Sequence, residues 1–141
     1  MKEERKRLAR LHRLEKIRDI AKQTAAAEAA RAESTLSQLR TLSDRTRRLA
    51  SDYANRREAA DGAALHQLGS FVSGLQALSR TTDGDALRAQ SIADAKQQQL
   101  AEAERRRAAI EERAALQARL IAKAAHQPIL SGRKTSGTGL E

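Results

Sequence analysis

The sequence contains no cysteine, no tryptophan and a single proline in 141 residues. Without cysteine there is no disulfide bond, thiolate nucleophile or cysteine metal ligand, which fits a cytoplasmic protein. Tyr53 and Phe71 are the two aromatic residues, and no apolar run approaches the ~20 residues that cross a bilayer. Much of the apolar content is alanine, which buries little area. We therefore expect neither a thick globular core nor a membrane-spanning segment.

What the sequence does contain is alanine, leucine, arginine, glutamine, glutamate and lysine, the residues with the highest helix propensity. Apolar positions recur at steps of three and four along two stretches of the chain. The first stretch holds Leu8, Leu11, Leu14, Ile17, Ala21, Ala25, Ala32, Leu39, Leu42, Thr46, Leu49 and Tyr53. The second holds Leu100, Ala103, Arg107, Ile110, Ala114, Gln117, Ile121 and Ala124. Stripes this narrow are buried only against another long helix, so the prediction is an all-α fold of two long helices forming an antiparallel coiled-coil hairpin.

Two places compete for the reversal of the chain. Asp61 and Gly62 form one turn signal, and Thr-Thr-Asp-Gly-Asp at 81–85 forms another. A reversal at 61–63 gives matched arms, residues 3–60 and 64–126, whereas a reversal at 81–85 leaves nearly half of the longer stripe uncovered. We favour 61–63, with a kink or short break in the second arm at 81–85.

The coiled coil is accordingly expected to cover residues 1–126. The last helix is expected to end near His126, before Pro128. The stretch from Ser131 to residue 139 is small and polar, and residues 127–141 are therefore predicted to form a disordered tail. Monomer and dimer remain open, because the same stripe pairs as well between chains as within one.

Catalytic, cofactor-binding and metal sites are not expected. His12, His66 and His126 are far apart in sequence and lack the spacing of zinc ligands. Ser-Gly-Arg-Lys-Thr at 131–135 lacks the upstream glycine and the preceding strand of a phosphate-binding loop. The sequence therefore predicts a protein that is not an enzyme.

The net charge of +9, from 27 Lys/Arg and 18 Asp/Glu, indicates acidic partners. Residues 1–22 alone hold nine Lys/Arg and four acids, a net charge of +5. Leu8, Leu11, Leu14 and Ile17 with their basic neighbours make an amphipathic helix suited to an anionic membrane surface, although the coil needs the same residues. Arginine clusters at 45–48, 56–57 and 105–107 support an alternative function, a basic nucleic-acid-binding coiled coil, but their side chains point around the helix in several directions.

The largest apolar side chains near the favoured turn are Tyr53, Phe71, Leu75 and Leu78. They lie on opposite arms, so the hairpin brings them toward one another. They either close the end of the coil or form a docking patch for a partner. A docking patch requires at least one of Phe71, Leu75 and Leu78 to lie outside the buried seam.

These positions carry a resemblance to the FliJ family of flagellar type III export proteins, relatives of the YscO-type stalk proteins of injectisomes. Leu42, Leu49 and Tyr53 match the family's leucines and tyrosines before the turn, and Phe71, Leu75 and Leu78 match its Phe-x3-Leu-x2-apolar pattern after it. The family has a second tyrosine where this chain has Leu49, and a continuous helix where we expect a break at 81–85. The resemblance covers residues 1–126 and does not distinguish a flagellar system from an injectisome.

The resemblance implies a stalk and general chaperone of bacterial flagellum biogenesis that regulates an ATPase during protein transport. The free ends of the hairpin would enter the hexameric export ATPase ring, through Arg5, Lys6, Arg7, Leu8 and Leu11. The matched positions, Leu42, Leu49, Tyr53, Phe71, Leu75 and Leu78, would contact the cytoplasmic domain of the export gate. Substrate chaperones are further implied partners. The expected location is the cytoplasm, with peripheral association at the inner membrane left open.

Overall fold

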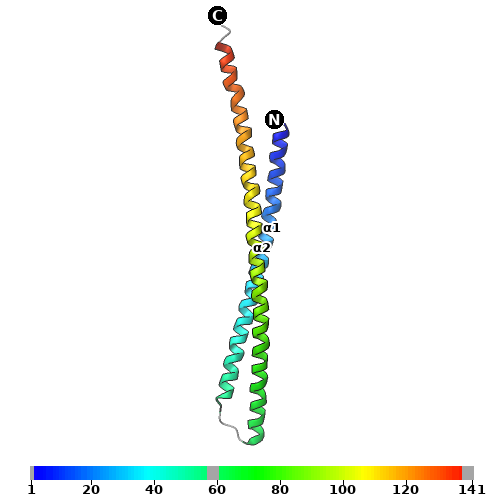
Figure 1. Ribbon diagram of the computed structural model, residues 1–141, viewed down its shortest axis with the longest axis vertical. Helices are drawn as coiled ribbons and strands as arrows, with labels where there is room; N and C mark the ends of the chain where they lie inside the picture. Colours follow the sequence, from blue (N-terminus) through cyan, green and yellow to red (C-terminus); the bar gives the residue numbers. More distant parts are fainter. Residues whose placement is uncertain (1, 57–60, 138–141) are drawn as a thin grey trace. The chain divides into compact units, whose positions relative to one another are not determined.

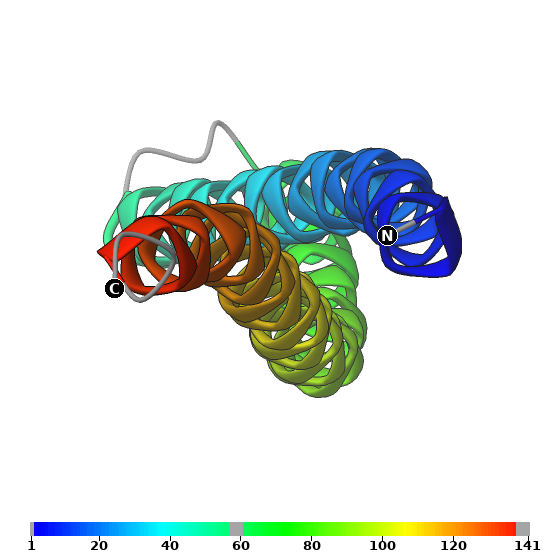
Figure 2. The same ribbon diagram turned by 90° about the horizontal axis from the view of Figure 1, so that it is seen from above.

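The computed structural model describes the backbone of residues 2–56 and 61–137 and the side chains of residues 2–56 and 61–126. Within these residues there are two long α-helices and no strand: α1 spans Lys2–Ala54 and α2 spans Gly62–Gly137. Figure 1 shows both as continuous ribbons, and Figure 2 shows them from above. The predicted all-α fold of two long helices is confirmed. Neither described helix has a stretch apolar and long enough to cross a lipid bilayer.

Internal contacts divide the chain into unit 1, which comprises Met1–Ala25 and Leu100–Glu141, and unit 2, which comprises Ala26–Gln99. Each unit takes one part of α1 and one part of α2. In unit 1, Gln117 reaches the Glu4 carbonyl and Arg107 reaches Asp19, so that rising numbers on one helix meet falling numbers on the other. In unit 2, Lys96 meets Glu28 and Asp83 meets Arg47. The helices therefore run antiparallel in each unit.

The reversal lies where the sequence favoured it, between the end of α1 and the start of α2. Asp61 caps α2: its Oδ1 accepts a hydrogen bond from the Ala64 N–H at 2.8 Å, and its carbonyl accepts one from the Leu65 N–H at 3.1 Å. A side-chain cap of this kind satisfies an N–H group that has no partner within the helix. The first helix ends earlier than expected, at Ala54 rather than residue 60, and residues 57–60 lie outside the described part of the chain.

The expected break at 81–85 is wrong, because α2 runs through these residues without interruption. Thr82 is buried, and its hydroxyl donates to the Leu78 carbonyl one turn earlier at 2.8 Å. Thr81 bonds the Ala77 carbonyl in the same way at 3.1 Å. Both threonines thus satisfy their hydroxyls within the helix. Residues 81–85 therefore form part of a helix despite their turn-like composition, and packing against α1 stabilises this helix.

The second helix also continues past its expected end near His126. It extends to Gly137, so residues 127–137 of the expected tail have a helical backbone in which Pro128 has no N–H to donate. Residues 138–141, the remainder of that tail, lie outside the described residues.

A seam of buried and half-buried residues runs along each helix with an unbroken alternation of three and four. On α1 it comprises Leu8, Leu11, Glu15, Arg18, Lys22, Ala25, Ala29, Ala32, Leu36, Leu39, Ser43, Thr46, Ala50 and Tyr53. On α2 it comprises Leu68, Val72, Leu75, Ser79, Thr82, Ala86, Ala89, Ala93, Lys96, Leu100, Ala103, Arg107, Ile110, Ala114, Gln117, Ile121 and Ala124. This alternation is the heptad repeat of a left-handed coiled coil. The predicted second stripe is confirmed and reaches further back along α2.

The predicted first stripe is only partly correct. Leu14, Ile17, Leu42 and Leu49 are exposed, and each lies one residue before a seam position. Seam positions next to them are held by Glu15 and Arg18 in unit 1 and by Ser43 and Ala50 in unit 2. Among the described residues about half of the large apolar side chains thus lie outside the seam, while alanine, serine and threonine fill much of it.

An uninterrupted α2 predicts that Gly84 is replaceable. A Cβ placed there would meet its nearest heavy atom, Arg88 Nη1, at 3.9 Å, and at Gly74 nothing lies within 4 Å. Neither glycine has a positive φ. We expect Gly84→Ala and the matched control Gly74→Ala each to raise the free energy of unfolding by about 0.5–1 kcal/mol, measured by urea denaturation. A loss of stability in Gly84→Ala beside a gain in Gly74→Ala would show that the chain bends at 81–85.

Candidate partner-binding surfaces

The seam assigns heptad positions and thereby separates two sides of unit 2. With seam residues as a and d, Arg40 and Arg47 of α1 and Asp83 and Gln90 of α2 all occupy e positions, directly after a d residue. Arg47 Nη2 contacts Asp83 Oδ2 at 2.9 Å, and Arg40 donates to Gln90 Oε1. The e positions of both helices therefore lie together on one polar side of the pair.

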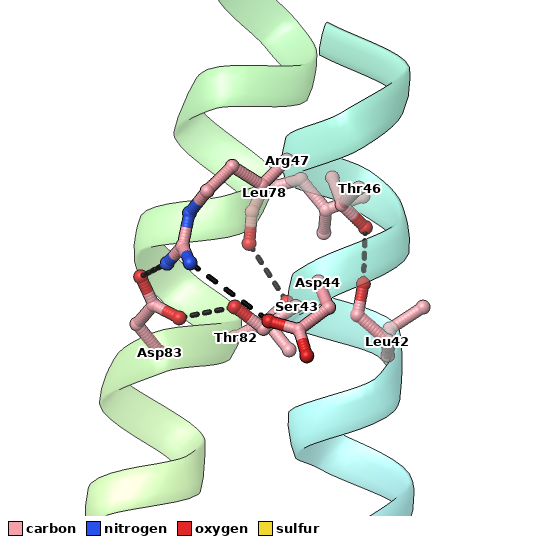
Figure 3. A network of polar contacts seen from close by, with 8 residues as sticks. All are labelled: Leu42, Ser43, Asp44, Thr46, Arg47, Leu78, Thr82 and Asp83. Atoms are coloured by element: carbon pink, nitrogen blue, oxygen red, sulfur yellow. Dashed lines mark hydrogen bonds and ion pairs between the residues drawn. The ribbon is translucent and has the colours of Figure 1, made fainter. Parts of the chain in front are cut away.

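A polar network holds this side together (Figure 3). The buried Ser43 hydroxyl donates to Asp83 Oδ1, and Arg47 bridges Asp83 to Asp44, whose Oδ1 lies 3.8 Å from Arg47 Nη1. The hydrogen bond from Ser43 lowers the pKa of the Asp83 carboxyl below its ordinary value, and the charge of Arg47 lowers it further, against the opposing effect of burial. Asp83 is thus an anion that ties α2 to two residues of α1.

The g positions, directly before an a residue, flank the seam on the other side. In unit 2 five of them carry large apolar side chains. The four nearest the turn, which we call the apolar face, are Leu42, Leu49, Phe71 and Leu78. Their exposed fractions are 42–49%. Leu42 in Figure 3 lies on the side of α1 away from Asp83. Both helices therefore supply large apolar residues to the same side of the pair.

The predicted site residues near the turn divide between the seam and this face. Leu75 is buried at 9% exposure, Tyr53 is half-buried, and Phe71 and Leu78 are exposed. The Tyr53 and Phe71 rings meet edge to face with centroids 5.0 Å apart, and the Arg56 guanidinium lies 4.2 Å from the Tyr53 centroid. The prediction that the hairpin brings these rings together is confirmed. A docking patch requires at least one of Phe71, Leu75 and Leu78 to lie outside the seam, and Phe71 and Leu78 both do.

The residues predicted to enter an ATPase ring lie on α1 in unit 1. Arg5, Lys6 and Arg7 are exposed, and Lys6 pairs with Glu3 at 3.8 Å. Leu8 and Leu11 are half-buried seam residues. The structure therefore leaves the cations accessible and uses the two leucines against α2.

Sequence reasoning missed two exposed residues, Ile92 and Ile20. Ile92 occupies the g position two heptads after Leu78, and Leu14, Ile17 and Ile20 line the outside of α1 in unit 1. When the seam is assigned to the largest apolar residues, these side chains are predicted to be buried or are left unassigned, although they are exposed. Two closely packed helices favour small residues in the seam, and this preference could have indicated that some of the larger apolar residues lie outside it.

Arginines in the clusters that suggested nucleic-acid binding are partly engaged within the protein. Besides Arg47, Arg106 pairs with Glu102, and Arg107 lies 3.0 Å from Asp19 and 3.7 Å from Glu111. Within the described residues no group of three or more potential metal ligands converges. Comparison with protein-family models, curated proteins and solved structures gave no match. The function of the chain is therefore inferred from its exposed apolar and basic side chains.

The network predicts a dependence of stability on pH. Because folding lowers the pKa of Asp83, its stabilisation is present above the unfolded value of about 3.9 and is lost as pH falls through the lower folded value. We expect Asp83→Asn to lower the melting temperature at pH 7, and we expect this difference from the parent protein to shrink as pH falls below about 3.9. Asp52→Asn, an exposed control, should show no such convergence. A constant difference between Asp83→Asn and the parent across this pH range would contradict the role of the Asp83 charge.

Proposed function

We propose that this chain is a non-enzymatic coiled-coil stalk and general chaperone of a type III protein export apparatus, of the FliJ kind. In this proposal it works in the cytoplasm, contacts an export ATPase hexamer through unit 1, and contacts the cytoplasmic domain of the export gate through unit 2. Substrate chaperones are further partners. The observation that carries the proposal is the apolar face, which leaves four large apolar side chains half-exposed beside a seam that includes small residues such as Ser43, Ala50 and Ser79.

The apolar face leaves unused part of the free energy that burial of its four side chains would release. A half-exposed leucine or phenylalanine retains roughly 1 kcal/mol that further burial would release. Exposed single leucines are ordinary, but here four lie on one side of one helix pair near its turn. Aromatic anchors among aliphatic neighbours are typical of interaction hot spots. The face thus supports a protein partner that covers both helices at once.

The thickness of each unit also supports the proposal. In the part of the chain that the structure describes, each unit contains two antiparallel helix segments, and one helix with side chains is about 10–12 Å across. Seam residues such as Ala29, Ala50, Ala89 and Ala93 keep such a pair thin. A thin helix pair with accessible cations on Arg5, Lys6 and Arg7 suits insertion into a protein ring with an acidic lining.

The direct test adds the purified chain to the export ATPase of the same organism. We expect co-elution of the two proteins and faster ATP hydrolysis, because a stalk that enters the ring orders its subunits. Arg5→Gln with Lys6→Gln and Arg7→Gln should weaken both effects, whereas Arg31→Gln with Arg45→Gln and Arg48→Gln removes equal charge elsewhere and should not. An ATPase that neither binds the parent chain nor responds to it would refute the proposal.

The apolar face is tested by comparing an exposed residue with a seam residue. Phe71→Ala should reduce binding to the export-gate domain by about 2 kcal/mol or more. It should lower the free energy of unfolding by only about 1 kcal/mol, from the lost Tyr53 contact. Leu75→Ala should lower the free energy of unfolding by about 2–5 kcal/mol and affect binding only through unfolding. Binding is measured by calorimetry and stability by circular dichroism melting.

Unchanged gate binding by folded Phe71→Ala would remove the face from the proposal. Leu87→Ala serves as the control for an exposed leucine outside the face. It should leave both quantities near those of the parent protein.

A further inference from the structure

The outside of α1 in unit 1 carries two parallel rows of exposed side chains. The apolar row is Leu14, Ile17 and Ile20, with exposed fractions of 39%, 58% and 62%. The basic row is Arg10, Arg13 and Lys16, all exposed. Each cation precedes one apolar residue by four positions, and side chains four apart are neighbours on a helix surface. The two rows therefore run side by side as diagonal stripes, with each cation about 40° around the helix from its apolar neighbour, so that basic and apolar side chains alternate around this face.

This face is free because α2 packs on a different side of α1. In unit 1, Arg107 Nε lies 3.0 Å from Asp19 Oδ1, and Leu8 and Leu11 are half-buried in the seam. The seam between Leu11 and Ala25 passes through Glu15, Arg18 and Lys22, not through the apolar row. Ile17 and Ile20 therefore lie away from the seam, and Leu14 flanks it with 39% of its surface exposed.

The cations of the basic row are also uncommitted within the described part of the chain. No ion pair joins Arg10, Arg13 or Lys16 to an acid there, while nearby His12 and Lys6 lie against Glu15 and Glu3. Residues 1–22 carry a net charge of +5. A second copy of this chain would bring like charges together at this face, so self-association through it is disfavoured.

The spacing of the apolar row distinguishes a bilayer from a partner helix. Steps of three drift backward around a helix with 3.6 residues per turn, so the three side chains spread over about 120° of its circumference. A helix partner selects a narrow straight seam with alternating steps of three and four. A fluid interface accepts a broad apolar face, with cations beside it at the level of the lipid phosphates.

We propose that this face of α1 binds an anionic phospholipid surface. The apolar row enters the boundary between headgroups and acyl chains, and the basic row lies against the headgroup phosphates. Binding is reversible, because three aliphatic side chains bury little area and the remaining attraction is electrostatic and screened by salt. This function is separate from the proposed stalk function, since it uses neither the apolar face of unit 2 nor a protein partner.

The test is sedimentation of the full chain with phosphatidylcholine vesicles that contain about 30% phosphatidylglycerol, a composition with negative surface potential. We expect binding to these vesicles and little to pure phosphatidylcholine. Replacing the apolar row by Leu14→Gln, Ile17→Gln and Ile20→Gln should weaken partitioning at least about tenfold, since glutamine keeps the helix propensity but not the apolar area. Replacing the basic row by Arg10→Gln, Arg13→Gln and Lys16→Gln should do the same.

Matched controls remove equal features elsewhere. Leu87→Gln, Leu116→Gln and Leu120→Gln replace three other exposed leucines, and Arg31→Gln, Arg45→Gln and Arg48→Gln remove three other exposed cations. Both controls should stay within about twofold of the parent chain. Equal losses in the control and basic-row variants would overturn the proposal in favour of attraction by net charge. Unchanged binding by the apolar-row variant would overturn it too, as would absence of binding by the parent chain.

A second measurement does not depend on multiple substitutions. Because the chain has no cysteine, Ile17→Cys provides a unique attachment point for an environment-sensitive fluorophore. We expect a blue shift of its emission when anionic vesicles are added, and none for the same label at Leu116→Cys. Equal shifts at both positions, or no shift at Ile17→Cys, would overturn the assignment of this face.

Discussion

The unbroken heptad seam is the constraint on which the rest of this structure depends. It requires side chains at alternating steps of three and four to face the other helix along both α1 and α2. Where alanine, serine and threonine occupy these positions in unit 2, little free energy comes from apolar area. Specific polar contacts add to it there, such as Ser43 with Asp83 and Lys96 with Glu28. The seam also places the positions beside it, so that near the turn of unit 2 the e residues form a polar side and the g residues Leu42, Leu49, Phe71 and Leu78 an apolar one.

The architecture was readable from the sequence because it follows from composition and helical period. Long runs of helix formers predict two helices, and matched arm lengths predict a reversal near Asp61, which indeed caps α2. The failure at 81–85 has a physical cause. Threonine, aspartate and glycine are turn residues when isolated, but at Thr82 and Asp83 they occupy a seam position and an e position with partners on α1 or in α2 itself. Tertiary packing overrides local propensity there.

The exposed surfaces were harder to predict than the fold, because parts of the predicted stripe on α1 lie one residue before the observed seam. Leu42 and Leu49 directly precede Ser43 and Ala50. A stripe drawn through the largest apolar residues therefore fits the helical period as well as the true seam does. Periodicity alone cannot decide between the two phases, because both repeat every seven residues. Only the pairing of two helices, in which small residues allow close approach, selects one phase and leaves the leucines outside.

The distribution of charge gives the two units different capacities for interaction. Unit 2 holds ten Lys/Arg and nine acids, a net charge of +1, and several of these form pairs across the seam or along a helix. Unit 1 holds 17 Lys/Arg and nine acids, a net charge of +8. Apolar residues exposed on the nearly neutral unit favour contacts governed by shape and area. Those exposed on the basic unit lie in a positive potential that selects anionic partners before contact is made. The same phase shift of the seam therefore produces two chemically different surfaces, because the neighbouring charges differ.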